Sequence, residues 1–451
     1  MKELCITYPS LPFLSEVMQC TITQILAKIH GANFMRRIVL SELQESLISS
    51  VPSFIDFRKA LISHIQEVVK ERVKDVKTVP ITIRGPQSEL RSVISKRFAR
   101  TLSTVDIQLR ERTRREKIYD WFGDEVLRAF INFINRTIQS ENDFRREFSG
   151  EWRIEVTRSS INILSPGRAE YNFPAIIRTS LLYEQARLFG LRDTKPRGSV
   201  SKGVLRLRCS PLWYMFLLSG VISSLATRIQ LTKGEDIHLY VGLSLHPMIN
   251  YEISEVQTLN EGITVVREVC RRSPFLEDLD LMRYLIIFNL YIRKAFTLNP
   301  AEYVIYGIKP EGARFTSRFN FSISTEELSV LDKKLETIWG DERDDVIIAL
   351  RDFGECLVRL YRIPAFQQEL PLDRLITTYK LICYAATEPG YKSPLDLIYE
   401  LLRILKEETV EARLKGLLRR YLQETYKLSE EKAKERIDHV WRRLISLAEI
   451  A

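Results

Sequence analysis

Two arginine-rich stretches hold the side chains best suited to chemistry in this sequence, and the chemistry that they suit is contact with phosphate. Arg84 to Lys117 has ten Lys or Arg residues against four Asp or Glu, and Arg192 to Arg208 has six against one. The planar guanidinium of arginine can bind a phosphate through two parallel hydrogen bonds and can stack on a nucleobase. The clustering therefore predicts a nucleic acid as the binding partner.

The first stretch is expected to be largely helical. Its apolar residues recur at helical spacing between Ser88 and Leu102, and Arg97 and Arg100, three positions apart, share one face of that helix. The alternative is a solvated helix face on which neighbouring glutamates, such as Glu89, form local ion pairs with the arginines. The sequence leaves both interpretations open.

The second stretch is expected to form a flexible basic loop. Between Lys195 and Gly203 it has too few apolar residues to pack into a core, and Asp193 is the one carboxylate in the whole stretch. Such a loop can lie along a phosphate backbone or enter a groove, where its amides and hydroxyls add hydrogen-bond donors. The alternative is an ordinary surface loop. The weak internal neutralisation favours binding, so this stretch carries most of the prediction.

A predicted hairpin near residues 304–323 is a third candidate, because it interleaves Tyr and Phe residues with arginine. Aromatic side chains can stack on bases, although in such a hairpin they more often pack against neighbouring structure. The aromatic residues are Tyr303, Tyr306, Phe315 and Phe319. The complete set of predicted nucleic-acid contacts is Lys195, Arg197, Ser199, Ser201, Lys202, Arg206, Arg208, Arg91, Lys96, Arg97, Arg100, Arg112, Arg115, Arg314 and Arg318.

No motif in the sequence indicates an enzyme. A P-loop and the Gly-x-Gly-x-x-Gly and Gly-x-Ser-x-Gly patterns are missing, the five histidines are far apart, and the six cysteines form no Cys-x-x-Cys pair. The acidic run 341–345 is the best metal candidate, but a helix start favours acidic residues anyway. We therefore predict no catalytic residue, no metal site and no cofactor. The alternative is a metal-dependent nuclease with a divergent carboxylate site, for which Glu302 and Asp344 are the residues to test.

The totals indicate a large soluble protein with unevenly distributed charge. A chain of 451 residues favours two or three domains. The net charge of +9 divides into +12 for residues 1–323 and −3 for residues 324–451. This asymmetry suggests one part that faces a polyanion and another that faces water or protein. The ratio of 45 Arg to 22 Lys also fits a thermophile or a GC-rich genome, which explains the ratio but not the clustering.

One apolar segment must be compared with a membrane-spanning helix. Residues 211–226 are too few to span a bilayer and include three serines, so we expect a buried core helix. We recognise no secretory signal, and the scattered cysteines fit a reducing compartment. The expected location is therefore the cytoplasm.

The expected fold is α+β and mainly helical, with a central antiparallel β-sheet region and a C-terminal helical bundle. We predict a mostly helical N-terminal region with a basic segment over residues 1–150. An α+β region that includes the basic loop 192–208 is predicted over 151–323, and the bundle over 324–451. Helical spacing predicts helices at 14–29, around 39–48, from Phe54 onward and at 112–139. Alternation of apolar and polar residues predicts strands at 152–163, 204–208, 237–245 and 304–323.

A basic α+β body followed by a near-neutral helical bundle, in a chain of this length without catalytic motifs, resembles the large subunit of type I CRISPR surveillance (Cascade) complexes, especially the archaeal type I-A form. The resemblance implies a non-catalytic subunit that holds the 5′ end of the guide RNA and reads a short protospacer-adjacent motif (PAM) on duplex DNA. It also implies that the subunit helps to open the duplex and docks a helicase–nuclease.

The same resemblance implies guide RNA, target DNA and other protein subunits as partners. Residues 192–208 would then be the motif-sensing or strand-holding loop, and the bundle would line the displaced-strand path or contact small subunits. A structural scaffold, with arginines in internal ion pairs, is the remaining alternative.

Overall fold

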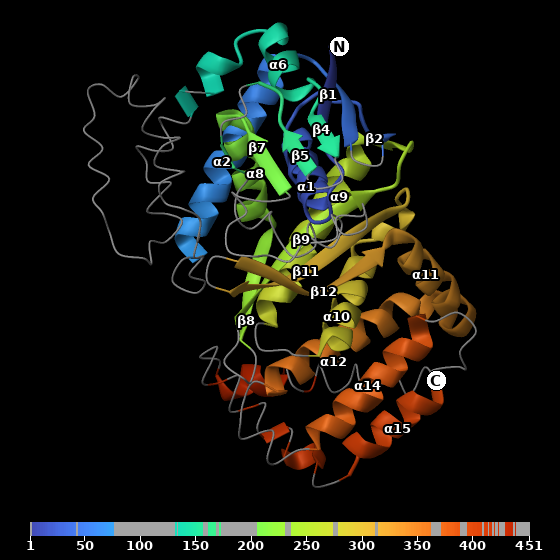
Figure 1. Cartoon of the computed structure of the whole chain (residues 1–451). Coiled ribbons are helices and arrows are strands. Elements are labelled where there is room, and N and C mark those ends of the chain that lie inside the picture. The colour runs from blue at the N-terminus through green and yellow to red at the C-terminus, as the bar shows by residue number, and fades with distance from the viewer. Residues whose placement is uncertain are drawn as a thin grey trace. The chain divides into compact units, whose positions relative to one another are not determined.

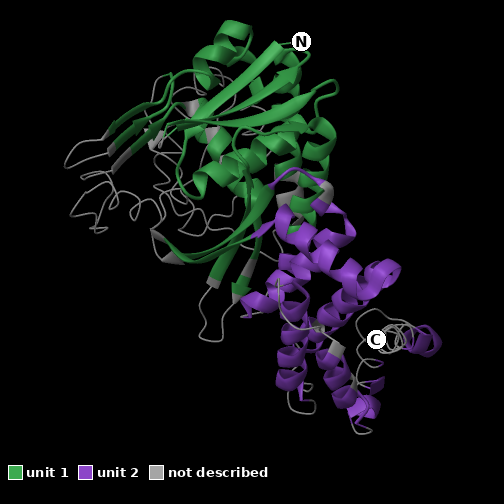
Figure 2. Cartoon of the chain, turned by 90° about the vertical axis from the view of Figure 1, so that its right-hand side faces the viewer, with its two compact units in different colours: residues 1–267, 301–322 green, residues 268–300, 323–451 purple. Residues whose placement is uncertain are grey.

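The chain forms two compact units. The computed structural model describes residues 2–41, 44–75, 131–132, 134–156, 161–167, 171–172, 205–230, 236–273, 278–311, 314–361, 371–387, 395–407, 410–413, 415–416, 419, 423, 429–435 and 438. Unit 1 comprises residues 1–267 and 301–322, and unit 2 comprises residues 268–300 and 323–451 (Figure 2). The fold class is the predicted one, α+β with antiparallel sheets and a helical C-terminal region.

Unit 1 contains three four-stranded sheets and the helices packed on them (Figure 1). Its elements are β1 (Lys2–Pro9), α1 (Leu14–Leu26), β2 (Phe34–Ser41), β3 (Gln44–Val51), α2 (Phe54–Asp75), α6 (Glu141–Phe148), β4 (Arg153–Val156), β5 (Ile161–Leu164), β6 (Tyr171–Asn172), β7 (Leu205–Cys209), α8 (Pro211–Ser224), β8 (Leu225–Gln230), β9 (Asp236–Leu245), β10 (Asn250–Glu252), α9 (Ile253–Arg272), β11 (Ala301–Glu311) and β12 (Arg314–Ser324).

The first sheet has the strand order β1-β3-β2-β10, and every neighbouring pair is antiparallel. β1 and β2 therefore run parallel, with β3 between them, and α1 makes the connection from β1 to β2. The predicted helices at 14–29 and from Phe54 onward are confirmed as α1 and α2. Of the predicted helix 112–139, residues 131–132 and 134–137 are helical. Residues 112–130 and 133 lie outside the described residues.

The predicted helix around Val39–Ile48 is wrong, because this segment is the hairpin of β2 and β3. Its apolar residues recur at positions that a helix would also place on one face. In the sheet, however, β3 is covered on both faces, so its polar residues Glu45, Ser46 and Ser49 are buried together with Leu47. Burial on both faces removed the two-residue alternation that identifies a strand.

The second sheet has the order β12-β11-β9-β8. It confirms the predicted strand at 237–245 and the predicted hairpin at 304–323, which is formed by β11 and β12. β9 and β11 are paired from Leu245 opposite Ala301 to His238 opposite Ile308. Most side chains on both faces of these two strands are buried, so β9 and β11 lie in the interior of unit 1, whereas most described side chains of β12 are exposed or half-buried.

The third sheet has the order β4-β5-β7-β6. β4 and β5 form the hairpin expected from the alternation at 152–163, and β7 confirms the strand expected at 204–208. β5 and β7 are parallel, which the sequence did not indicate. α8 follows β7 directly and confirms the predicted buried helix at 211–226, although its last two predicted residues already begin β8.

α1 is the central helix of unit 1. Twelve of its thirteen residues are buried, and it packs against β9, α8 and α2. Glycines on two neighbours permit this close approach. A Cβ at Gly242 of β9 would lie 2.6 Å from the Cβ of Glu16, and one at Gly220 of α8 would lie 2.7 Å from Oγ1 of Thr21. Both distances are shorter than van der Waals contact, so a side chain at either position would displace α1.

A polar network surrounds the start of α1. Arg37 of β2 forms a two-pronged ion pair with Glu45 of β3, with N···O distances of 2.8 and 2.9 Å. Glu45 also accepts hydrogen bonds from Tyr8, Ser10 and Ser15. Burial alone would raise the pKa of Glu45, but the hydrogen bonds and charge of Arg37 outweigh it and leave the pKa below its usual value.

A second carboxylate near this network has no such compensation. Glu16 lies in the first turn of α1, and its Oε2 atom is buried with no hydrogen-bond partner among the described residues. Burial raises the pKa of Glu16 to about 6, despite hydrogen bonding with Tyr306. The ionised form of Glu16 therefore costs folding free energy at neutral pH.

Glu16→Gln is expected to stabilise unit 1 at pH 7 by ~1–2 kcal/mol, because one pKa unit corresponds to about 1.4 kcal/mol. The folded-state pKa of Glu16 lies above its unfolded value, so the protonated side chain contributes its full stabilisation below pH 4.5. This contribution is lost as pH rises through 6. The variant should therefore match the wild type at pH 4 and exceed it at pH 7. Hydrogen exchange of α1 as a function of pH measures this difference. Glu261→Gln, at an exposed site on α9, is the control, and an equal gain there would contradict the assignment.

Unit 2 is a helical bundle with its own core. Its elements are α10 (Leu279–Ile292), η4 (Ala295–Thr297), α11 (Thr325–Trp339), η5 (Gly340–Glu342), α12 (Arg343–Tyr361), α14 (Leu372–Thr387) and α15 (Leu395–Leu405). The predicted N-cap at Ser324 is confirmed, since Oγ of Ser324 accepts a hydrogen bond of 3.0 Å from the amide of Glu327. Leu328, Leu331 and Leu335 are buried along α11, and α10 packs against α12 and α14.

Candidate nucleic-acid interface

Most of the predicted contact residues lie outside the described part of the chain. This holds for the whole stretch from Arg84 to Lys117 and for the loop residues Lys195, Arg197, Ser199, Ser201 and Lys202. Arg206 and Arg314 are described only by their backbone positions on β7 and β12. Arg208 and Arg318 are described with their side chains, and both are exposed.

The described end of the second arginine-rich stretch lies on the third sheet. Its residues Leu207 and Cys209 are buried, so the face of β7 that carries them packs into unit 1. Arg208 is on the opposite face and is exposed. Pairing places two rows of residues across that outer face: Arg153–Leu164–Arg208 and Glu155–Asn162–Arg206. Three of these six positions are arginines, and one is acidic.

Arg153 and Arg208 are separated by one strand. Neighbouring strands lie ~4.8 Å apart, so two spacings place these arginines roughly 10 Å from each other on the sheet. Two arginines at this separation can contact different phosphates of one nucleic-acid strand. Leu164 between them is only half-buried, which leaves an apolar site between two cations.

No described residue neutralises the charge of these two arginines. Among the described residues, neither Arg153 nor Arg208 forms an ion pair or a side-chain hydrogen bond. The acidic residue of this face, Glu155, accepts a hydrogen bond of 3.4 Å from Asn162. Arg145 and Arg146 of α6 are also exposed, but they pair with Glu141 and Asp143. The outer face of the third sheet is thus the described surface best suited to bind phosphate.

Arg153 was missed as a contact residue. The sequence showed it in alternation with Trp152 and Ile154, which predicted the strand, but not which strand would lie beside it. Only the parallel pairing of β5 with β7 brings Arg153 into one row with Arg208. A parallel partner some forty residues away leaves no local signal in the sequence.

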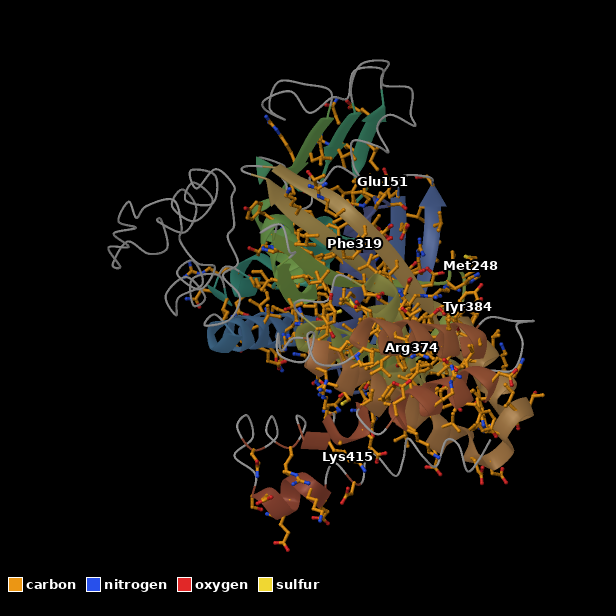
Figure 3. All side chains as sticks on the ribbon, turned by 90° about the horizontal axis from the view of Figure 1, so that it is seen from below. Glu151, Met248, Phe319, Arg374, Tyr384 and Lys415 are labelled. Carbon is orange, nitrogen blue, oxygen red and sulfur yellow. The ribbon has the colours of Figure 1, made fainter. Side chains whose placement is uncertain are left out.

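The aromatic residues of the hairpin of β11 and β12 support packing rather than base stacking. Tyr303 and Tyr306 are buried. Phe319, labelled in Figure 3, covers Gly307 of β11 and stacks on Phe321. Arg318 precedes Phe319 on the strand and therefore points to the other face of the sheet. The described aromatics and Arg318 do not form one stacking surface.

The carboxylates considered for a nuclease site are not gathered into a metal site. No group of three metal-ligating side chains occurs among the described residues. Asp344 lies in the first turn of α12 and accepts a hydrogen bond of 3.1 Å from Tyr291, which also donates to Asp332 at 2.6 Å. Glu302 is an exposed residue of β11 opposite Ser244 of β9.

Burial shifts the pKa values of His64, Cys20 and Cys270. Burial, with the nearby charges of Lys28 and Arg267, lowers the pKa of His64 to about 3, so this imidazole is neutral at physiological pH. Burial raises the pKa of Cys20 and of Cys270 to about 12, which keeps both thiols protonated and unreactive.

Comparison with known protein families and with curated proteins gives no match. In the residues that the structure describes, no helix has the length and apolar character needed to cross a membrane.

Proposed function

We propose that this chain is a non-catalytic nucleic-acid-binding protein that contacts phosphates with the outer face of its third sheet. The observation that carries the proposal is the row of Arg153 and Arg208, two exposed arginines without ion pairs among the described residues. In sequence, β7 is preceded directly by the basic residues 192–204. A basic loop that continues from a strand with exposed arginines supports one continuous phosphate-binding surface.

The setting that we propose is the large subunit of a CRISPR RNA-guided surveillance complex. The support comes from the sequence: the length, the basic α+β body, the near-neutral helical bundle and the missing catalytic motifs. In this setting, the phosphate-binding surface would hold guide RNA or target DNA, and the remaining subunits would supply cleavage.

Arg153→Ala combined with Arg208→Ala is expected to weaken binding of a labelled single-stranded RNA or a labelled DNA duplex. The loss of two phosphate contacts should reduce the slope of log K against log salt by roughly 1.4–1.8 and the affinity by about three- to tenfold. Fluorescence anisotropy between about 0.05 and 0.2 M salt measures both quantities.

The matched control is Arg145→Ala combined with Arg146→Ala, which removes the same charge from exposed but ion-paired arginines. Equal losses in both double variants would reduce the effect to net charge and contradict the proposed surface. Lys195→Ala, Arg197→Ala and Lys202→Ala, combined in one chain, report on the loop in the same assay. Metal-dependent cleavage of the probe would favour the nuclease alternative, and no binding at low salt would favour the scaffold.

A further inference from the structure

A second surface of unit 1 has the features of a protein-docking site. β2 lies beside β10 only from Phe34 to Arg36, and Arg37 then receives a hydrogen bond of 2.9 Å from the amide of Met248. Beyond Arg37, no described strand pairs with the outer edge of β2. Residues 38–40 therefore form an open strand edge in the described structure.

The backbone of this edge is oriented to receive another strand. Arg37 uses its carbonyl group on the outer side of β2, where it accepts a hydrogen bond from the amide of Met248. In an extended strand, alternate residues direct their N–H and C=O groups to the same side. The alternation holds from Arg37 to Val39, where a β-bulge between Val39 and Ser41 ends it. Val39 therefore presents its amide and carbonyl outward, in continuation of the Arg37 carbonyl that Met248 already uses. Unpaired groups of this kind are the template for β-strand addition.

The side chains at this edge are apolar and exposed. Among the described residues of unit 1, four large apolar side chains are exposed, and three of them lie here: Val39 at 46%, Leu40 at 55% and Met248 at 68%. Figure 3 shows Met248 at the margin of the unit. Met248 has a φ of 69°, a left-handed conformation that is uncommon for methionine. The chain thus accepts local strain in a turn that exposes an adaptable apolar side chain.

The positive charge of Arg36, beside this edge, indicates that the partner carries an acidic residue. Arg36 lies on β2 between Phe34 and Ile38, and its Nε atom is buried without a hydrogen-bond partner. No ion pair of Arg36 occurs among the described residues. A buried guanidinium nitrogen without an acceptor is costly, and a carboxylate from outside would relieve that cost. The complementary ligand is therefore an apolar strand that carries an acidic residue.

We propose that the open edge of β2 receives an extended segment of a protein partner, with apolar side chains against Val39, Leu40 and Met248 and a carboxylate that reaches Arg36. The segment adds to the first sheet next to residues 38–40, on the side of β10. This site is independent of the phosphate-binding surface and does not need nucleic acid.

A synthetic peptide tests this chemistry on the full chain. The probe is a short fluorescein-labelled peptide in which valine alternates with threonine and one threonine is replaced by aspartate. Fluorescence anisotropy is expected to show binding that weakens at least about tenfold when alternate amides of the peptide are N-methylated, because strand addition uses those amides. A peptide with lysine in place of aspartate should also bind more weakly. Equal binding of the parent and N-methylated peptides would overturn the proposal.

Variants of the chain locate the site. Val39→Pro removes an amide that points away from β3, so it should keep the hairpin and weaken the peptide at least about tenfold. Met248→Lys tests the same edge without a backbone change and should weaken the peptide as well. Ile55→Lys is the control, since Ile55 is exposed to 47% on α2, and it should leave binding unchanged. Losses as large in Ile55→Lys as in the edge variants would overturn the proposal.

Two other occupants give distinct results. If the wild-type chain sediments as a dimer and Val39→Pro as a monomer, the edge is filled by a second copy. If the amide of Val39 exchanges slowly in the wild type without peptide, the chain fills its own edge. Either result would overturn the assignment to a separate protein partner, whereas fast exchange that the peptide slows would support it.

Discussion

Glu45→Ala is expected to lower the free energy of unfolding of unit 1 by about 3–5 kcal/mol. The substitution leaves the guanidinium of Arg37 without its buried carboxylate and removes the acceptor for Tyr8, Ser10 and Ser15. Breaking one side of a buried ion pair costs more than the pair contributes, because the remaining charge stays desolvated. Hydrogen exchange of peptides from β1 and β3 reports the loss within unit 1 alone.

The control is Glu67→Ala, which removes an exposed carboxylate paired with Lys28 and should have a much smaller effect. A chain that carries both Arg37→Met and Glu45→Leu should recover part of the stability, because no uncompensated charge remains. If Glu45→Ala costs less than about 1 kcal/mol, the ion pair is not the structural centre that its geometry indicates.

The loss should also depend on pH. Arg37 and the hydroxyl donors hold the pKa of Glu45 below its usual value, so its contribution is present above the unfolded pKa near 4.5 and is lost as pH falls through the lower folded value. The difference between the wild type and Glu45→Ala is therefore expected to be constant at neutral pH and to shrink in acid. Glu16 has the opposite dependence, since its raised pKa favours acid.

Trp213→Ala is expected to destabilise unit 1 by about 3–5 kcal/mol. Trp213 is fully buried on α8, and its ring lies against Trp152, Phe148 and Phe216. Its Nε1 donates a hydrogen bond of 2.6 Å to the carbonyl of Glu147. Truncation would leave a large cavity where α6, α8 and the third sheet meet. Denaturant unfolding, followed by hydrogen exchange of α8 and α6, measures the change.

Trp213→Phe separates packing from hydrogen bonding. It keeps most of the ring but leaves the carbonyl of Glu147 without its donor, which should cost about 1–2 kcal/mol. Nearly equal losses for Phe and Ala would show that the hydrogen bond, not the aromatic packing, dominates. A small loss for both would contradict the central role of this aromatic cluster.

The sequence predicted the elements that have one dominant period. α8 was recognised because its apolar residues cover all sides of the helix, and β9 because Ile237, Leu239 and Val241 alternate with more polar residues. The N-cap at Ser324 was recognised from the spacing of Ser324 and Glu327. In each of these segments, local spacing and tertiary burial agree.

The failure at Val39–Ile48 arose from tertiary pairing. Glu45 is an inward-facing residue of β3, and the sequence alone treats a glutamate as an outward one. Its burial is possible only because Arg37 lies beside it on β2. The candidate site was also only partly predictable. The basic composition of residues 192–208 predicted Arg208 as a contact residue. Arg153 lies in the site because β4, β5 and β7 pair side by side. Long-range pairing of this kind is not encoded in spacing along the chain.

The interleaving of the two units has a consequence for how the protein is made. Unit 1 is complete only with β11 and β12, yet residues 268–300 of unit 2 emerge from the ribosome before them. α10 likewise waits for α12 and α14, which are synthesised later. Until residue 311 has left the ribosome, β9 lacks its β11 neighbour and exposes an apolar strand edge. A single cut cannot separate the two units, because a fragment that contains all of unit 1 also carries residues 268–300 of unit 2.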